Sequence, residues 1–290
     1  MAIPHDIVTR ITRAAADLPP SEQKVAHLVL SDIQSAAAAS IDALAAQARV
    51  STASVTRFAR ALGCQDVRDL KRQLVLAGAI GARFLEQPRA DGPDDSADLV
   101  HRDIIELLQA NLVLVDRDRM RSAALLLRKA RMIYAFGLGG GSAMIADEAR
   151  NRLVRLGLPV ASYQDAVMQR IAAATMDEHC VVLALSATGQ AGELLGSVAI
   201  AREYGARILA ITALGSPLAA QSDVLLAIQT RETDVVIKPS SSRYALLMAL
   251  DILATETALT DRSRSQHLLR RIKLVLDAHR SGPDRQPLGD

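Results

Sequence analysis

The chain has 290 residues and half of them are apolar, which is enough for two domains with cores of their own or for one large domain. The formal net charge is only +2, so overall charge gives no argument for nucleic-acid binding. The distribution of charge along the chain matters more. Residues 1–85 carry ten Lys and Arg against seven Asp and Glu, which places a slight basic excess at the N-terminal end.

Two further features of the sequence bear on location and on bound groups. No stretch approaches the roughly 20 consecutive apolar residues that a membrane span needs, and the sequence does not open on a secretory signal pattern. Cys64 and Cys180 lie far apart and form neither a disulfide framework nor a metal-binding spacing. We therefore expect a cytoplasmic protein without a metal site or a cofactor.

The first eighty residues favour helices. The segment Pro19–Ser21 is a typical helix start, and after it Val25, Leu28 and Val29 recur at helical spacing. Residues 40–63 then predict a helix, a tight turn and a second helix, because Ser40 and Ser51 each precede a helical run that a hydroxyl can cap. Gly63 closes the second helix. This arrangement is typical of a DNA-reading motif.

The second of these helices has two unlike faces. At about 100° per residue its apolar side chains, Val55, Phe58, Ala59 and Leu62, cluster on one side. The opposite side carries arginines, which can grip guanine or a phosphate, and no acid. The hydroxyls at the helix start suit phosphate contacts. The residues that we expect to contact DNA are Ser51, Thr52, Ala53, Thr56, Arg57 and Arg60. The alternative is a helical hairpin with a merely solvated outer face.

A domain boundary is indicated by a change of composition. After a basic helix around Asp69–Ile80, the segment 86–96 carries Pro, Gly and acids without an apolar anchor, as a linker does. We expect a helix-turn-helix domain over residues 1–82, a linker over 83–98 and a second domain over 99–290.

In the second domain the hydrophobic pattern is helical at first and then alternates between short apolar runs and helical stretches. The helical segments Leu99–Val115 and Arg119–Ala130 come first. The predicted strands are Met132–Phe136, Pro159–Tyr163, Cys180–Leu185, Ile208–Ile211 and Val224–Ile228. This alternation predicts a doubly wound α/β domain with a five-stranded, mostly parallel sheet, whose core spans about residues 131–260. In such sheets ligands bind at the carboxyl ends of strands.

The segment Gly137–Ser142 follows the first predicted strand and precedes a helix predicted over Ala143–Leu156. A glycine turn before a helix N-terminus presents backbone N–H groups and the positive end of the dipole to an anion. Ser142 adds a hydroxyl donor. The third glycine of a dinucleotide fingerprint would fall at Ser142, and no acid ends the next strand. No Gly-Lys-Ser/Thr follows either, so neither a nicotinamide site nor a P-loop is indicated.

The segment Ser186–Glu193 follows the third predicted strand and is a second candidate anion site. Ser186 and Thr188 stand two apart in an extended turn, and Gly189 lets the backbone approach a ligand closely. The alternative is an ordinary capped turn. Because this segment and the glycine segment leave the same sheet, we favour a phosphate site.

A long helix is predicted over Ser242–Leu259. Its apolar side chains exceed what one face can bury, namely Tyr244, Leu247, Met248 and those of Leu250–Leu253, so we expect them to provide dimer contacts. An interior core helix is the alternative. The preceding segment Lys238–Arg243 has hydroxyls and cations that suit a phosphate but also suit an ordinary helix start.

These segments carry a resemblance over nearly the whole chain. The stretches Pro19–Ala26, Ile41–Ala48 and Val50–Gly63 resemble the N-terminal domain of RpiR-type bacterial transcriptional regulators. Gly137–Ser142 and Ser186–Gly189 resemble the two ligand loops of the sugar isomerase (SIS) domain that follows in that family. The family's second loop often reads Ser-x-Ser-Gly-x-Thr, and Ala191 here replaces the last hydroxyl. The first loop has one glycine more than the commoner form.

The resemblance implies a homodimer or tetramer that binds palindromic operator DNA and a phosphorylated sugar. Ser142, Ser186 and Thr188 would contact the sugar phosphate, and the effector site as a whole would comprise Gly139, Gly141, Ser142, Ser186, Thr188 and Gly189. SIS domains also occur in phosphosugar isomerases, which need a base near the reacting carbons. The candidates for that base are Glu148, Glu193, His101 and His179. Their spacing marks no catalytic pair, so we expect a regulator and no catalytic residue.

Overall fold

The computed structural model describes residues 6–85, 96–231 and 239–280, which form two compact units divided near residue 90. Each unit is described by itself. None of the helices in these ranges is long and apolar enough to cross a membrane.

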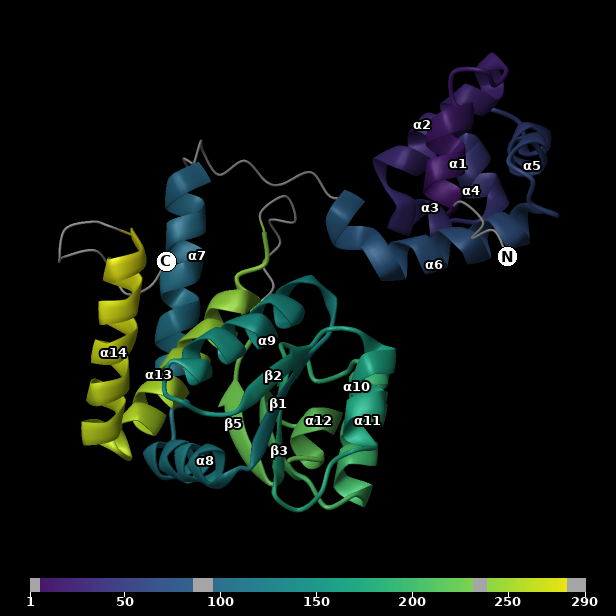
Figure 1. The fold of residues 1–290 in the computed structure, drawn as a ribbon. Coiled ribbons are helices and arrows are strands. Elements are labelled where there is room, and N and C mark those ends of the chain that lie inside the picture. Colours follow the sequence, from purple (N-terminus) through teal and green to yellow (C-terminus); the bar gives the residue numbers. More distant parts are fainter. Residues whose placement is uncertain (1–5, 86–95, 232–238, 281–290) are drawn as a thin grey trace. The chain divides into compact units, whose positions relative to one another are not determined.

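Residues 6–85 form a helical unit around one apolar cluster (Figure 1). Its helices are α1 (Ile7–Ala14), α2 (Pro20–Ser31), α3 (Ile33–Ala38), α4 (Ile41–Gln47), α5 (Thr52–Ala61) and α6 (Val67–Leu85). Side chains start several of them: Asp6 and Asp32 accept backbone N–H groups at the starts of α1 and α3, and Pro20 occupies the first turn of α2. Phe58 of α5 belongs to this cluster and is fully buried.

The second unit contains a five-stranded parallel sheet in the order β2-β1-β3-β4-β5. The strands are β1 (Met132–Gly137), β2 (Val160–Tyr163), β3 (Cys180–Ser186), β4 (Arg207–Ala213) and β5 (Val224–Ile228). The predicted α/β class and the five strands are thus confirmed. All seven residues of β3 are buried, as expected of a central strand covered on both faces.

Helices cover both faces of this sheet (Figure 1). The helices are α7 (Ser96–Leu112), α8 (Arg117–Lys129), α9 (Gly139–Val154), α10 (Ala166–Ala173), α11 (Gly192–Glu203), α12 (Pro217–Ala220), α13 (Ser242–Leu259) and α14 (Arg262–Arg280). One apolar cluster lies between the sheet and helices α8, α9 and α13, and a second between the sheet and helices α10, α11 and α12. Helix α14 was not predicted from the sequence.

Two predicted boundaries differ from the structure. Helix α9 begins at Gly139 and not after Ser142, so most of the glycine segment is the first helical turn. At the predicted linker, residues 83–85 belong to α6 and Ser96 opens α7, while residues 86–95 lie outside the described part of the chain.

Candidate functional site

The predicted helix-turn-helix is formed by α4 and α5, and both predicted caps are present. Ser40 Oγ accepts the N–H of Ala43 at 3.1 Å, and Ser51 Oγ accepts the N–H of Ser54 at 3.3 Å. In the turn between the helices Arg49 has φ +54°, the left-handed conformation that usually falls to glycine after a helix.

Replacing Arg49 with glycine is expected to stabilise the helical unit by about 0.5–1 kcal/mol, because an L side chain is strained in this conformation and Arg49 is exposed. Differential scanning calorimetry of the full chain measures the change. The matched control is Arg68→Gly, at an exposed position of α6 with ordinary helical backbone, which should destabilise the unit. A lower melting temperature for the Arg49 variant would contradict the assignment of strain.

The two faces of α5 are placed as the sequence predicted. Its inward side chains are buried in the helical cluster: Val55, Phe58, Ala59 and Leu62. The outward face exposes Ala53, Arg57 and Arg60, with Thr56 half-buried, and the start of the helix exposes Ser51 and Thr52. The structure thus brings the six proposed DNA-contacting residues onto one face and the adjoining helix start.

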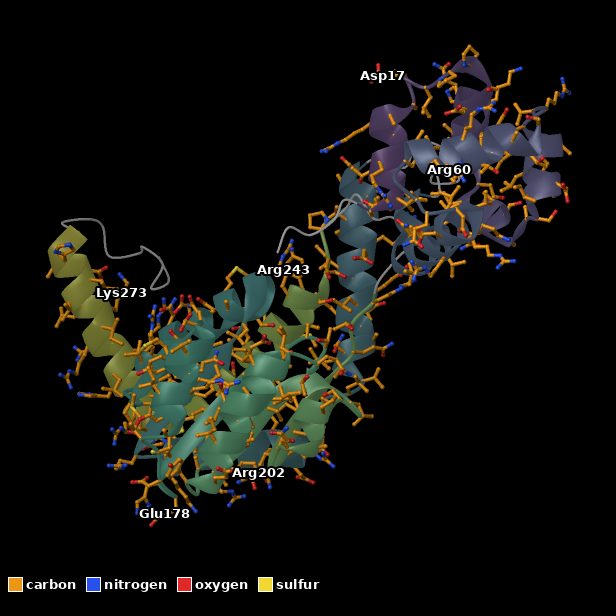
Figure 2. The ribbon with its side chains drawn as sticks, turned by 90° about the vertical axis from the view of Figure 1, so that its right-hand side faces the viewer. Asp17, Arg60, Glu178, Arg202, Arg243 and Lys273 are labelled. Atoms are coloured by element: carbon orange, nitrogen blue, oxygen red, sulfur yellow. The ribbon has the colours of Figure 1, made fainter. Side chains whose placement is uncertain are left out.

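The two arginines of this face differ in their contacts. Arg57 Nε lies 3.4 Å from Oε1 of Glu22 in α2, and Arg57 Nη2 donates to Ser54 Oγ at 3.0 Å. Arg60, labelled in Figure 2, is exposed on this face, and with the described residues it makes no hydrogen bond or ion pair. Sequence reasoning missed Glu22, although its position on the stripe with Val25, Ala26 and Val29 indicates that it faces inward.

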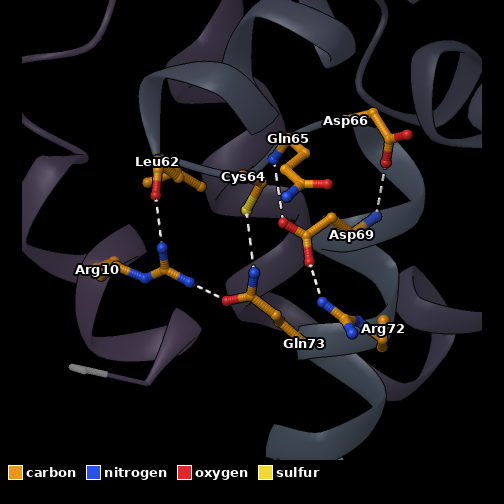
Figure 3. A network of polar contacts seen from close by, with 8 residues as sticks. All are labelled: Arg10, Leu62, Cys64, Gln65, Asp66, Asp69, Arg72 and Gln73. Carbon is orange, nitrogen blue, oxygen red and sulfur yellow. Dashed lines mark hydrogen bonds and ion pairs between the residues drawn. The ribbon is translucent and has the colours of Figure 1, made fainter. Parts of the chain in front are cut away.

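A polar network holds the C-terminal end of α5 against α1 and α6 (Figure 3). Arg10 donates to the carbonyl of Leu62 at 2.7 Å and also hydrogen-bonds Gln73, whose amide donates to Cys64 Sγ. Burial raises the pKa of the Cys64 thiol. Nearby, the hydrogen bond from Arg72 lowers the pKa of Asp69 to about 2. This network connects the C-terminal end of α5 to α1 and α6.

The second candidate site lies at the carboxyl edge of the sheet, between β1 and β3. The chain passes from β1 to β2 on one side and then continues with β3 on the other, so β1 and β3 flank the point where the strand order reverses. Gly137 of β1 pairs with Leu185 of β3, so the two candidate loops leave neighbouring strands side by side. This is the usual ligand position in open parallel sheets.

The loop after β1 is shaped by its glycines. A Cβ at Gly137 would lie 2.2 Å from the carbonyl oxygen of Ser142, so this position admits only glycine where the first turn of α9 folds back on the strand. Gly139 has φ +75°, and a Cβ at Gly139, Gly140 or Gly141 would meet nothing within 4 Å. The start of α9 has no side-chain cap, so no capping side chain bonds the N–H groups of its first turn. Ser142 is half-buried in this first turn.

The loop after β3 is held by its own hydroxyls. Ser186 is buried and its Oγ accepts the N–H of Gly189 at 3.0 Å, while Thr188 is exposed and its Oγ1 accepts the N–H of Gln190 at 3.4 Å. Both hydroxyls thus serve the turn as acceptors, and each keeps its O–H for a further acceptor. Gly189 has φ +66°, and a Cβ there would lie 2.2 Å from Ser216 Oγ.

Two buried polar side chains that sequence reasoning missed lie beneath these loops. Gln169 of α10 donates to the carbonyls of Tyr163 at 2.8 Å and Gly137 at 3.3 Å, and so joins the ends of β2 and β1. Thr212 of β4 pairs with Ser186 of β3, and its buried Oγ1 has no hydrogen-bond partner among the described residues. Neither side chain stands in a recognisable motif: Gln169 acts through hydrogen bonds from α10 to the ends of β1 and β2, and Thr212 lies beside Ser186 through strand register.

Helix α13 combines the two roles that the sequence left open. Leu250 and Leu253 were predicted to contribute to a dimer contact, but both are buried in the core, as the alternative of an interior helix requires. Tyr244, Leu247 and Met248, with Ile252, Leu108, Asp251, Thr255 and Glu256, line a groove of about 440 Å³ on the other face. Before the helix, Lys238 lies outside the described residues, and Arg243 stacks on the ring of Tyr244 at 4.8 Å.

The candidate bases for an isomerase do not form a cluster. Glu148 pairs with Arg152 at 3.0 Å, and Arg152 also pairs with Asp251 of α13 at 3.0 Å. His179 is 67% exposed beside Glu178. Glu193 and His101 are exposed on α11 and α7. No hydrogen bond or ion pair joins any two of these four candidates in the described residues.

Comparison with known proteins relates both units to described families. Residues 5–79 match the model of the helix-turn-helix domain of the rpiR family, and residues 126–256 match that of the SIS domain. The chain is 36% identical to the transcriptional regulator HexR of Pseudomonas aeruginosa over 98% of this chain and 99% of that protein. It is 32% identical to HexR of Escherichia coli over 95% and 96%.

Two further similarities concern part of a relative and the fold. The chain is 32% identical to the bifunctional protein glk of Burkholderia orbicola over 90% of its length, but it spans only 41% of that protein. The structure of Vibrio vulnificus NanR in complex with ManNAc-6P has a TM-score of 0.60 at 18% identity and covers 94% of this chain and 98% of NanR. The sugar isomerase domain of an RpiR transcription factor from Sphaerobacter thermophilus has a TM-score of 0.56 at 22% identity over 62% of this chain and 98% of that one.

Proposed function

This chain belongs to the rpiR family of helix-turn-helix transcriptional regulators, and from that premise we propose that it binds operator DNA under the control of a phosphorylated sugar. The observation that carries the proposal is the pairing of an outward arginine face on α5 with a second unit whose two glycine loops meet at the switch point of a parallel sheet. The NanR structure that shares this fold holds ManNAc-6P, which is a ligand of the proposed class.

We assign DNA contacts to the outward face and start of α5. Arg57 and Arg60 would reach base edges or phosphates, and Thr56 and Ala53 would make apolar contacts with bases such as the thymine methyl group. Ser51 and Thr52 lie at the helix N-terminus, where N–H groups and the dipole favour a phosphate.

We assign the effector phosphate to the space between the two loops. Gly139, Gly141 and Ser142 would offer backbone N–H groups and one hydroxyl at the start of α9. Ser186, Thr188 and Gly189 would offer the hydroxyls and close backbone approach of the loop after β3. Ala191 offers no hydroxyl, so this loop has one donor fewer than the common form.

Regulation would follow from a difference in effector affinity between two arrangements of a homo-oligomer. Two reading helices must lie about 34 Å apart to enter successive major grooves on one face of a duplex. A modest rotation between subunits therefore suffices to end operator binding. The groove on α13 offers apolar surface for such a subunit contact.

The test uses the purified full chain. It should retard duplexes that it selects from a random-sequence library, and a member of a phosphosugar panel should both raise its melting temperature and change that retardation. Conversion of a phosphosugar without any duplex retardation would overturn the proposal in favour of an isomerase.

Replacing Ser186 with alanine together with Thr188 with valine is expected to weaken the phosphosugar at least about tenfold, because two hydroxyl donors to a charged group are lost. Duplex binding without effector should be unchanged. Thermal shift and gel retardation measure the two effects. Ser197→Ala is the matched control, because its hydroxyl donates to Glu193 O within α11 and faces the core. A normal effector response in the double variant would place the site elsewhere.

A further inference from the structure

Helix α2 carries a buried carboxylate that points to the reading helix. Glu22 is 4% exposed and lies on the inward stripe of α2, with Val25 and Val29 in the apolar cluster. Its oxygen Oε1 lies 3.4 Å from Nε of Arg57 on α5. Because a buried charge is retained only with a partner, this pair couples the orientation of α2 to one side chain of the outward face of α5.

The contacts of Arg57 restrict its guanidinium from two sides. Nε faces Glu22, and Nη2 donates to Ser54 Oγ, which in turn lies 3.1 Å from the Oγ of the capping residue Ser51. A guanidinium has five N–H donors, and the side chain of Arg57 is 58% exposed, so several donors remain open to a ligand. These two contacts favour one orientation of the Arg57 guanidinium in the absence of DNA.

Within the described part of the chain, Arg60 differs from Arg57 both in its lack of an ion pair and in its lack of a contact that restricts its orientation. It is exposed one turn further along α5 and makes no hydrogen bond or ion pair with the described residues. Its charge is not compensated locally, and its side chain has its full rotamer freedom to lose when it binds. An uncompensated flexible cation attracts phosphates of any sequence.

We propose that Glu22 is a positioning residue for sequence reading: it holds Arg57 as a pre-oriented base contact and cancels its attraction for phosphates, while Arg60 supplies the adaptable phosphate contact. The inference rests on the proposed function of α5 as the DNA-reading helix. Pre-orientation reduces the rotamer entropy lost on binding, and charge cancellation removes one sequence-blind attraction. Both effects raise the ratio of specific to non-specific affinity.

The test replaces Glu22 with glutamine in the full chain. The amide keeps the size of the side chain and can still accept from Arg57, but one negative charge is lost, so the net charge of the reading unit rises by one. The probes are a duplex selected by the wild type from a random library and a scrambled duplex of the same composition. We expect a twofold to fivefold gain in affinity for the scrambled duplex at low salt, a steeper salt dependence, and at least a fivefold loss in the affinity ratio.

Matched variants separate positioning from charge and from stability. Asp17→Asn makes the same change of charge at an exposed residue between α1 and α2 (Figure 2), and the affinity ratio should stay within twofold of the wild type. Glu22→Asp keeps the charge and should recover most of the ratio. In an Arg57→Gln background, Glu22→Gln should leave the ratio unchanged, because the residue acts through Arg57.

Two results would overturn the inference. One is an equal fall in affinity for both duplexes together with a lower melting temperature, which is the signature of a purely structural pair. The other is an unchanged ratio in the folded Glu22→Gln variant. A wild type that retards no duplex at all would instead remove the proposed function, so the two failures are distinguishable.

Discussion

Arg57→Ala is expected to lower both the stability of the helical unit and its affinity for operator DNA. Truncation leaves the buried carboxylate of Glu22 without its partner, which costs about 1–3 kcal/mol, the range for an unsatisfied buried polar group. The loss stays below the 3–5 kcal/mol of a fully buried pair because Arg57 is more than half exposed. Loss of the proposed base contact would cost a further 1–3 kcal/mol of binding, roughly fivefold to 150-fold in affinity.

The matched variant is Arg60→Ala. Its side chain makes no polar contact with the described residues, so the melting temperature should not change, while operator affinity should still fall. Calorimetry measures stability, where each kcal/mol corresponds to about 4–8 °C in a domain of 60–100 residues. Gel retardation below the melting transition of the variant measures affinity. Unchanged retardation by both variants would remove α5 as the reading helix, and equal stability of both would show that the contact to Glu22 is not maintained.

Gly137→Ala is expected to be the most damaging single substitution near the effector loops. The added Cβ would lie 2.2 Å from the carbonyl oxygen and 2.7 Å from the carbonyl carbon of Ser142. These are backbone atoms at the start of α9, so no rotamer change relieves the clash, and the helix must move away from β1. We expect a loss of about 3 kcal/mol, the upper end for overpacked cores, and loss of the effector response.

Gly140→Ala is the control for this substitution. A Cβ there meets nothing within 4 Å, so stability should be kept or should rise by roughly 0.5 kcal/mol, as for Gly to Ala in a helix. Phosphosugar affinity should nevertheless fall at least about tenfold, because the methyl group would occupy the space in which we place the anion. Thermal unfolding with and without phosphosugar measures both. Full effector affinity in Gly140→Ala would show that the ligand does not use the start of α9.

The architecture could be predicted from the sequence where local pattern decides the structure. The run Cys180–Leu185 is continuous and apolar, as expected of a strand covered on both faces, and it became β3 within a residue. The apolar run Val224–Ile228 became the edge strand β5, whose residues are buried or half-buried. Ser40 and Ser51 indicated the starts of α4 and α5 because capping is a property of neighbouring residues. The alternation of strands and helices then implied the parallel sheet.

Features that depend on tertiary packing escaped the sequence analysis. The glycine run after β1 indicated a loop, yet Gly139 takes a left-handed conformation from which a helix can start at once. The partnership of Glu22 with Arg57 depends on how α2 crosses α5, and the position of Thr212 beside Ser186 depends on strand register. The stripe of apolar neighbours around Glu22 was the one available signal.

The ion pairs of Arg152 connect helices α9 and α13 in the second unit. Arg152 lies on α9, the helix whose first turn we assign to the effector, and it grips Asp251 in the wall of the α13 groove. If the effector binds there as we propose, a displacement of α9 would reach the groove through this guanidinium, with no need for a change in the sheet. We would then expect ligand occupancy at the sheet edge and the shape of the α13 groove to change together.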